Sequence, residues 1–212
     1  CMYLRYLSII ENVNNHFQCH KGGVLYMRSS KTVINKNCIF INNTSENRGG
    51  AIHITKTNSV VNMLCIFKYN SANKMGGCLY GHRVQTYINL NSQFHFNHIK
   101  FLRTGLTFGG TGYFKNTSVL RNLHNIFSNN KAKIGGALYI SEAQFVLNTQ
   151  CLFQNNKASA AARLAKAGPF YGKEGGGAIF GHFLSNITNF QCVFKNNKSY
   201  FKSSNKRRHP KI

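Results

Sequence analysis

The sequence of 212 residues predicts an all-β fold, a parallel β-helix of about seven coils, from three observations. Two half-motifs recur, at first every 27 residues. Each unit is made of short runs rich in Phe, Ile, Val and Tyr that are interrupted by Asn, Gly and Ser, which is typical of strands. Phe, Asn and Gly return in the same register, as in solenoids whose units bury their apolar faces against their neighbours.

The first half-motif is a Phe followed three residues later by an Asn. Its copies are Phe40 with Asn43, Phe67 with Asn70, Phe94 with Asn97, Phe127 with Asn130, Phe153 with Asn156, and Phe194 with Asn197. We interpret Val13 and His16 as a degraded copy before them. Since neighbouring coils lie about 4.8 Å apart, we expect the Asn side chains to form an amide ladder at a bend and the Phe rings to stack in the interior.

The second half-motif is Gly-Gly followed by a small residue, an aliphatic residue and usually an aromatic one. Its copies are Gly22 to Tyr26, Gly49 to His53, Gly76 to Tyr80, Gly135 to Tyr139 and Gly176 to Phe180, with a weaker copy at Gly109-Gly110. We expect the glycine pairs to form a corner, where φ is positive or a side chain would strike the neighbouring coil. The second glycines that we assign to this corner are Gly50, Gly77, Gly136 and Gly177.

The register is interrupted twice between the Asn and the glycine pair, which predicts two insertions that leave the coil at the same corner. They span residues 98–108 and 157–174. Residues 158–167 are strong helix formers followed by Gly168-Pro169, so we expect a short surface helix there. Residues 1–197 are expected to form one domain, a segment of a longer protein, and residues 198–212 a basic disordered tail.

The net charge of +23, from 27 Lys and Arg against four Glu, leaves two interpretations open. The positive charge solubilises an extended surface, which we favour because the basic residues are dispersed among the coils, or it binds a polyanion such as an acidic glycan or nucleic acid. The candidate contacts for a polyanion are Lys157, Arg163, Lys166, Lys206, Arg207 and Arg208.

The cysteines and histidines indicate no metal site and no cofactor. Four cysteines lie two residues before a stacked Phe, at Cys38, Cys65, Cys151 and Cys192, and alternation along a strand turns them inward as buried free thiols. A disulfide between stacked Cys38 and Cys65 is the alternative, although parallel side chains are poorly aimed for one. The chain has no Cys-x-x-Cys pair, and the histidines form no recognisable ligand set.

Catalysis on a polysaccharide is the least favoured function, because glycoside hydrolysis ordinarily uses two neighbouring carboxylates. The chain has no Asp, and its four Glu are far apart in sequence. Glu174, beside a glycine run in the second insertion, is the one carboxylate that we consider able to act alone. Asn116 and Asn186 are the sequons that we expect to accept a glycan in a secretory setting.

Together, the two half-motifs resemble the repeats of the chlamydial polymorphic outer membrane proteins, most clearly at Phe40 to Ile52 and Phe127 to Leu138. The resemblance spans about residues 13–197 and implies a right-handed β-helix displayed at a cell surface, as the passenger of an autotransporter that acts in adhesion. We therefore expect a non-catalytic surface or secreted protein that offers an adhesive or structural binding surface to a host or surface ligand, with a polyanion-binding module as the alternative. No stretch reaches the about 18 apolar residues of a membrane span.

Overall fold

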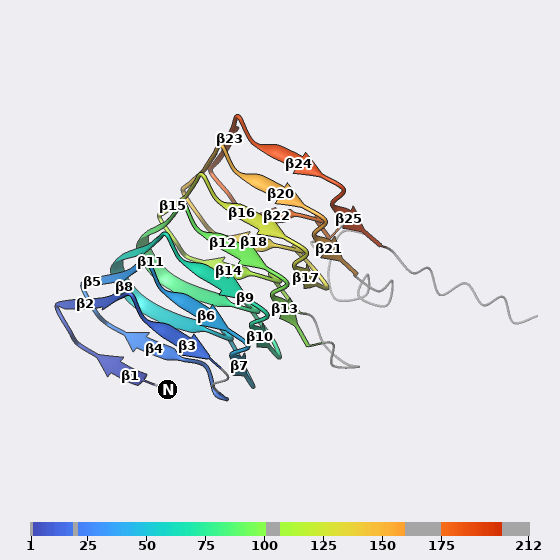
Figure 1. Ribbon diagram of the computed structural model, residues 1–212. Helices are drawn as coiled ribbons and strands as arrows, with labels where there is room; N and C mark the ends of the chain where they lie inside the picture. The colour runs from blue at the N-terminus through green and yellow to red at the C-terminus, as the bar shows by residue number, and fades with distance from the viewer. Residues whose placement is uncertain (1, 19–20, 101–106, 160–174, 201–212) are drawn as a thin grey trace, which may run out of the picture.

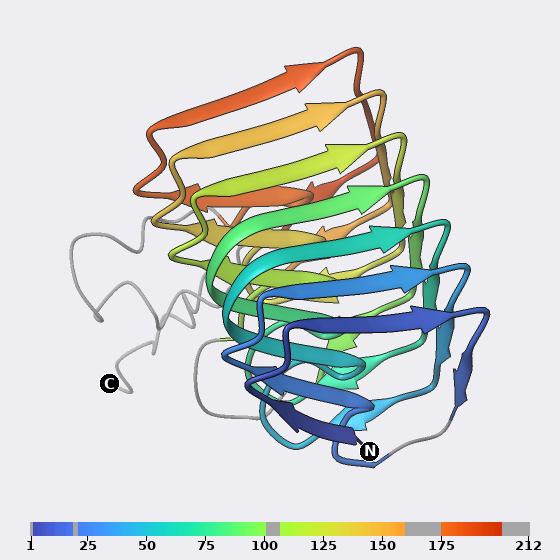
Figure 2. The ribbon, with the colours of Figure 1, turned by 90° about the vertical axis from the view of Figure 1, so that its left-hand side faces the viewer.

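The structure, a computed structural model, describes residues 2–18, 21–100, 107–159 and 175–200. These residues form seven coils of parallel strands, stacked from the N-terminal coil to the C-terminal one (Figures 1 and 2). Three parallel sheets run along the stack. The structure confirms the predicted parallel β-helix, and no described residue is in a helix.

The first sheet has 12 strands in two rows, which β8 and β11 join because each runs through both. One row consists of β1 (Met2–Arg5), β4 (Leu25–Arg28), β8 (Ile52–Met63), β11 (Leu79–Leu90), β14 (Gly112–Lys115), β18 (Leu138–Ser141) and β22 (Ile179–His182). The other adds β2 (Ile9–Val13), β5 (Thr32–Lys36), β15 (Val119–Leu123), β19 (Phe145–Thr149) and β23 (Asn186–Phe190).

The second and third sheets complete each coil with short strands. The second sheet holds β3 (His16–Gln18), β6 (Ile39–Ile41), β9 (Ile66–Lys68), β12 (Gln93–His95), β16 (Ile126–Ser128), β20 (Leu152–Gln154) and β24 (Val193–Lys195). The third holds β7 (Thr44–Ser45), β10 (Ser71–Ala72), β13 (His98–Ile99), β17 (Lys131–Ala132), β21 (Lys157–Ala158) and β25 (Lys198–Ser199).

The interior contains a column of stacked Phe rings. The rings of Phe67 and Phe94 have centroids 5.0 Å apart and are 3° from parallel, and the next pair, Phe94 and Phe127, is 4.8 Å apart. The interpretation of Val13 as the N-terminal copy is wrong. Phe17 pairs with Phe40 at a ring distance of 4.8 Å, whereas Val13 pairs with Lys36 and is 46% exposed.

The first coil is therefore shorter than the next ones. The step between equivalent residues is 23 from the first coil to the second and 27 from the second to the third. A fixed step of 27 cannot hold at the N-terminus, because the backbone pairing and the ring stacking both select Phe17.

The predicted ladder asparagines follow the Phe rings at a corner with left-handed backbone, and their amides are fully used. Asn70 Nδ2 donates to Asn97 Oδ1 at 3.1 Å and to the Phe40 carbonyl at 2.8 Å. Asn70 Oδ1 accepts from both Nδ2 and the backbone N–H of Asn43. The same Nδ2-to-Oδ1 bond continues from Asn97 to Asn130, Asn156 and Asn197. Each central amide thus makes four hydrogen bonds, two as donor and two as acceptor.

A second Asn ladder, which the sequence analysis missed, runs through every coil. Each Nδ2 donates to the next Oδ1 at 2.7–2.9 Å. Its members are Asn12, Asn35, Asn62, Asn89, Asn122, Asn148 and Asn189. Each lies five residues before the stacked Phe of its coil, so from the second coil on the repeat could have been read as Asn-x-x-x-x-Phe-x-x-Asn.

The two glycines of each pair are required for different reasons. Gly49, the first of its pair, has a φ of +61°, which favours glycine. Gly50, the second, packs so closely that an added Cβ would lie 2.2 Å from the Gly77 carbonyl oxygen of the next coil. Gly77 and Gly136 meet the next coil in the same way at 2.1 and 2.0 Å. Gly177 lies against the Lys198 backbone, at 2.8 Å from such a Cβ.

Both predicted insertions begin with residues that the structure places inside the coil. His98–Ile99 pair with Ser71–Ala72, and Lys157–Ala158 pair with Lys131–Ala132. Phe108 is bridged to Met75 and Ile134. The remaining residues of the two insertions, 101–106 and 160–174, lie outside the described residues, as do nearly all of the predicted helix and the tail from residue 201.

Candidate functional site

The outer face of the first sheet carries one aromatic ring from each coil, which we call the ring column. Each ring is the second residue of its strand, and the residues on either side of it point into the core, as Leu25 and Met27 do around Tyr26. The column consists of Tyr3, Tyr26, His53, Tyr80, Tyr113, Tyr139 and Phe180, with centroids 4.4–5.4 Å apart. An apolar stack thus follows the outside of the solenoid.

Three consecutive rings of the column, in the fourth to sixth coils, are covered. Tyr80, Tyr113 and Tyr139 are only 4%, 7% and 5% exposed. They pack with Met75, Phe108 and Ile134, the residues just before each glycine pair. The ring centroid of Phe108 lies 4.7 Å from that of Tyr139.

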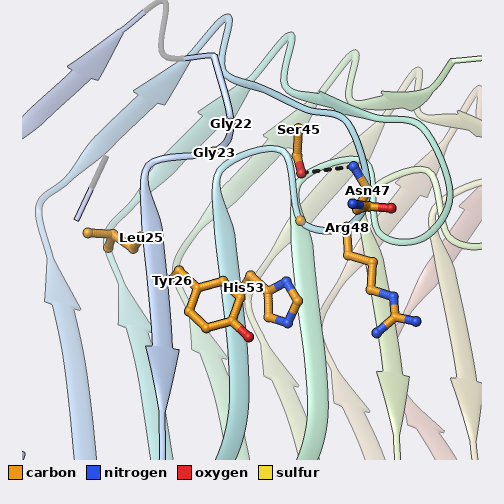
Figure 3. A pocket seen from close by; sticks show the side chains of 9 residues that line it. Gly22, Gly23, Leu25, Tyr26, Ser45, Asn47, Arg48 and His53 are labelled. Carbon is orange, nitrogen blue, oxygen red and sulfur yellow. Dashed lines mark hydrogen bonds between the residues drawn. The ribbon is translucent and has the colours of Figure 1, made fainter. Parts of the chain in front are cut away.

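The second and third coils leave the ring column open. Arg48 occupies the position that Met75, Phe108 and Ile134 occupy in later coils, and a parallel bridge aligns Arg48 with Met75. Tyr26 and His53 are half-buried there. They form one wall of a pocket of about 440 Å³, lined also by Arg48, Ser45 and Asn47 and by the backbone at Gly22, Gly23 and Gly49. Figure 3 shows the Tyr26 and His53 rings and Arg48 in a row below the Ser45–Asn47 loop.

Arg48 is held in place by the ring column itself. Its Nη1 donates to the Tyr80 hydroxyl at 3.3 Å, and its guanidinium lies 5.1 Å from the centroid of the Tyr80 ring. Within the described ranges no carboxylate forms an ion pair with Arg48. Stacking on a ring positions a guanidinium without neutralising it, so the Arg48 charge is available to a ligand.

His53 contributes an uncharged ring to this pocket at neutral pH. Burial and, to a smaller extent, the neighbouring positive charge of Arg48 together lower the pKa of His53 from 6.5 to about 4, although a hydrogen bond with the Arg48 backbone opposes the shift. Burial also raises the pKa of Tyr80 above its usual value. The pocket therefore combines neutral polar and aromatic groups with one cation, Arg48.

A second hollow of about 720 Å³ adjoins the pocket on the other side of the Ser45–Asn47 loop. Lys21 and Lys100 line it together with Glu46, and Gly22, Ser45 and Asn47 line both hollows. Asn47 is fixed in the loop by its backbone N–H, which donates to Ser45 Oγ at 3.3 Å. Together the two hollows are lined by three cations, Lys21, Arg48 and Lys100, and by one carboxylate, Glu46.

The predicted polyanion contacts lie elsewhere. Lys157 is exposed on β21, paired with Lys131 on one side and Lys198 on the other, and its ammonium lies 4.5 Å from the Tyr200 ring centroid. The remaining candidates fall outside the described residues: Arg163, Lys166, Lys206, Arg207 and Arg208. Of the two sequon residues, Asn186 is exposed and Asn116 half-buried; their glycosylation stays a prediction.

The thiols are structural groups. Cys38, Cys65 and Cys151 are free and buried, and the Cys65 thiol lies 3.3 Å from the Asn35 carbonyl oxygen as a donor. Burial raises the pKa of Cys65 to about 12 and that of Cys151 to about 11, so both stay protonated and unreactive at neutral pH. No cluster of metal-ligating residues occurs in the described ranges.

Tyr26, His53 and Arg48 were not predicted from the sequence as site residues. The signal was present in the glycine half-motif, whose fifth position carries the ring and whose preceding residue changes from Arg48 to Met75, Phe108 and Ile134. The change of residue type at the position before the glycine pair therefore marks the pocket in the sequence.

The repeat pattern of ladders, stacked Phe and glycine pairs also matches a known sequence family. Three stretches match the Chlamydia polymorphic membrane protein repeat. They span residues 37–55, 126–141 and 150–182, and thus cover both half-motifs. No curated protein and no solved structure gives a significant match to the chain. Among the described residues there is no helix of the length and hydropathy needed to cross a membrane.

Proposed function

We propose that this chain is a non-catalytic, surface-exposed or secreted β-helix whose outer face acts as an adhesive binding surface. The observation that carries the proposal is the open section of the ring column. It is a pocket with two half-buried rings and with Arg48, which has no carboxylate partner among the described residues. The matches to a repeat named after chlamydial membrane proteins support a surface location.

The carboxylates of the described residues support a non-catalytic role. Glu142 is engaged with Lys115, at 3.1 Å between Oε1 and Nζ. Glu11 is exposed on β2, where its neighbour in the next coil is Ile34, and Glu46 lies beyond β7 in the third sheet's corner. None of these placements provides the two facing carboxylates of a glycosidase. Glu174 lies outside the described residues.

Adhesion can be tested with beads that carry the purified chain. We expect these beads to bind monolayers of cultured animal cells several times more than beads that carry the thermally unfolded chain, because the binding face exists only in the folded coils. Equal binding by folded and unfolded chain would contradict the proposal. Turnover of a polysaccharide by the folded chain would contradict its non-catalytic part.

The exposed lysines of the third sheet favour a second candidate function, polyanion binding. The pairing of β21 with β25 places Lys157 directly opposite Lys198, with the two backbones about 4.8 Å apart, and like charges directly opposite each other on neighbouring strands are destabilising. A polyanion following the coil axis would relieve this repulsion. We expect the double variant Lys157→Gln/Lys198→Gln to elute from a heparin column at lower salt than the control variant Lys36→Gln/Lys56→Gln. Identical elution of the two variants would remove this candidate.

A further inference from the structure

We propose that the pocket at the open section of the ring column binds one acidic sugar unit of an oligosaccharide, with its ring on Tyr26 and its acid group on Arg48. This inference deepens the proposed function and rests on it for the biological setting, but it concerns the chemistry of this one site.

The volume and composition of the pocket fit a small polar ligand with one apolar face. Pockets for small ligands span about 300–1,000 Å³, and this one has about 440 Å³. A pyranose ring presents C–H groups on its faces and hydroxyl groups at its edge. The aromatic face of Tyr26 suits the former, and the polar groups of Ser45, Asn47 and the glycine backbone suit the latter.

The acid group is assigned to Arg48 by the charges around the pocket. Arg48 is anchored on Tyr80 and has no carboxylate partner among the described residues, so its guanidinium is ready for a carboxylate or sulfate. His53, next to it, is neutral at pH 7 and adds no second charge. The pocket thus offers a single cation, so it fits a sugar unit with one acid group. A polyanion would instead be held by many dispersed charges.

The adjoining hollow extends the site to a second sugar unit. Gly22, Ser45 and Asn47 belong to both hollows, so an oligosaccharide that leaves the pocket passes over this loop. Beyond it lie Lys21 and Lys100 together with Glu46. Because hydroxyl groups can pair with Lys21, Lys100 and Glu46 alike, we place the neighbouring unit there through its hydroxyl groups.

The position of Arg48 distinguishes a built site from general basicity. In the next three coils the same position holds Met75, Phe108 and Ile134, and the rings beside them are covered. From the second to the sixth coil, the half-buried rings therefore lie beside Arg48, whereas the rings beside Met75, Phe108 and Ile134 are covered. A diffuse positive surface would not explain why Arg48 lies beside the half-buried rings.

The test is a titration of the full chain with three probes at about 0.1 M salt, where charges beyond about 10 Å are screened. The probes are a hyaluronan hexasaccharide with carboxylates alone, a heparin-derived hexasaccharide that also has sulfates, and neutral maltohexaose. We expect at least one acidic probe to bind at least about tenfold more tightly than maltohexaose. The stronger of the two acidic probes identifies the acid group.

The variant Arg48→Met copies the residue of the next coil and should keep the fold while weakening the acidic probe about tenfold or more, as for the loss of a charge-assisted hydrogen bond. Arg121→Met, an exposed strand residue on β15, removes the same charge and should leave binding unchanged. Tyr26→Leu should weaken binding several-fold through the lost stacking. Equal effects of Arg48→Met and Arg121→Met, or equal binding of maltohexaose, would overturn the proposal.

The bead assay separates this inference from the proposed function. If Arg48→Met beads still adhere to cells and no acidic hexasaccharide binds, the sugar site is refuted and adhesion stands. If an acidic probe binds through Arg48 but beads do not adhere, the sugar site stands and the adhesive function is refuted.

Discussion

The two halves of the ring column share one backbone and differ in what lies over their rings. Between the fourth and sixth coils Tyr80, Tyr113 and Tyr139 are covered, whereas in the second and third coils Tyr26 and His53 stay half-buried beside a pocket. Strand pairing continues through both sections without a break. The residue before each glycine pair therefore decides whether the rings beside it are covered or open, while the strands stay the same.

The largest expected effect is the loss of a covered ring. Tyr113→Ala removes a ring stacked on both sides at 5.4 and 5.1 Å and should lower the free energy of unfolding by about 3–5 kcal/mol. Tyr26→Ala, in the open section, should cost about 1 kcal/mol, because water already reaches part of that ring. Urea unfolding measures both. Equal losses would show that the two sections do not differ in burial.

Removing a covering side chain should convert the closed section into an open one. Phe108→Ala is expected to cost about 3 kcal/mol and to expose Tyr113 and Tyr139 to solvent. The chain has no Trp, so its emission reports tyrosines, and quenching by acrylamide should increase. Phe145→Ala is the control, since Phe145 is already 57% exposed. Unchanged quenching in Phe108→Ala would mean that Phe108 does not cover the rings.

The free energy of unfolding should also depend on pH, through His53 in the open section. The pKa of His53 is about 4 in the folded chain and 6.5 in its ordinary state, so between these values the unfolded chain binds more protons. The contribution of His53 to stability is therefore complete above about pH 6.5 and is lost as pH falls towards 4. His53→Tyr continues the ring column without a titrating group. Urea midpoints of this variant should fall less than those of the parent chain between pH 6.5 and 4, and parallel curves would contradict the prediction.

The smallest effect concerns a corner of the third coil, beside the open section. Lys56 has a φ of 54°, whereas the same corner of the fifth coil is Asn116, with a φ of 52°. Left-handed backbone is less costly for Asn than for Lys. Lys56→Asn should raise the free energy of unfolding by about 0.5–1 kcal/mol, and Asn116→Lys should lower it by a similar amount. Thermal unfolding of both variants shows whether the signs are opposite.

The sequence was sufficient for the fold because stacking constrains many positions at once. Phe94, Asn97 and Gly77 each need an identical or compatible residue in the neighbouring coil, so the constraint appears as a repeat. The stacked residue of the first coil was not predicted correctly from the repeat. The step from this coil to the next is shorter, and Phe17 has no Asn three residues later to mark it.

The candidate site could not be found in the same way, because it consists of departures from the repeat at one position. In the sequence, Arg48 is one of 27 basic residues and nothing distinguishes it from the others. Only the structure shows that a backbone bridge pairs it with Met75 and that it lies beside the Tyr80 ring. The low pKa of His53 depends on burial between two neighbouring rings, which sequence spacing does not reveal.

The second Asn ladder gives the solenoid a direction and a unit of length. Every amide NH₂ in it points to the following coil and every oxygen to the preceding one, so a coil fits only in one orientation. Removing residues 52–78 would join Ala51 to Leu79 and bring Asn35 next to Asn89, which closes the ladder again. The molecule would be shorter by one coil, about 4.8 Å. Such a chain changes size in whole coils, and a partial coil would leave an amide without its partner.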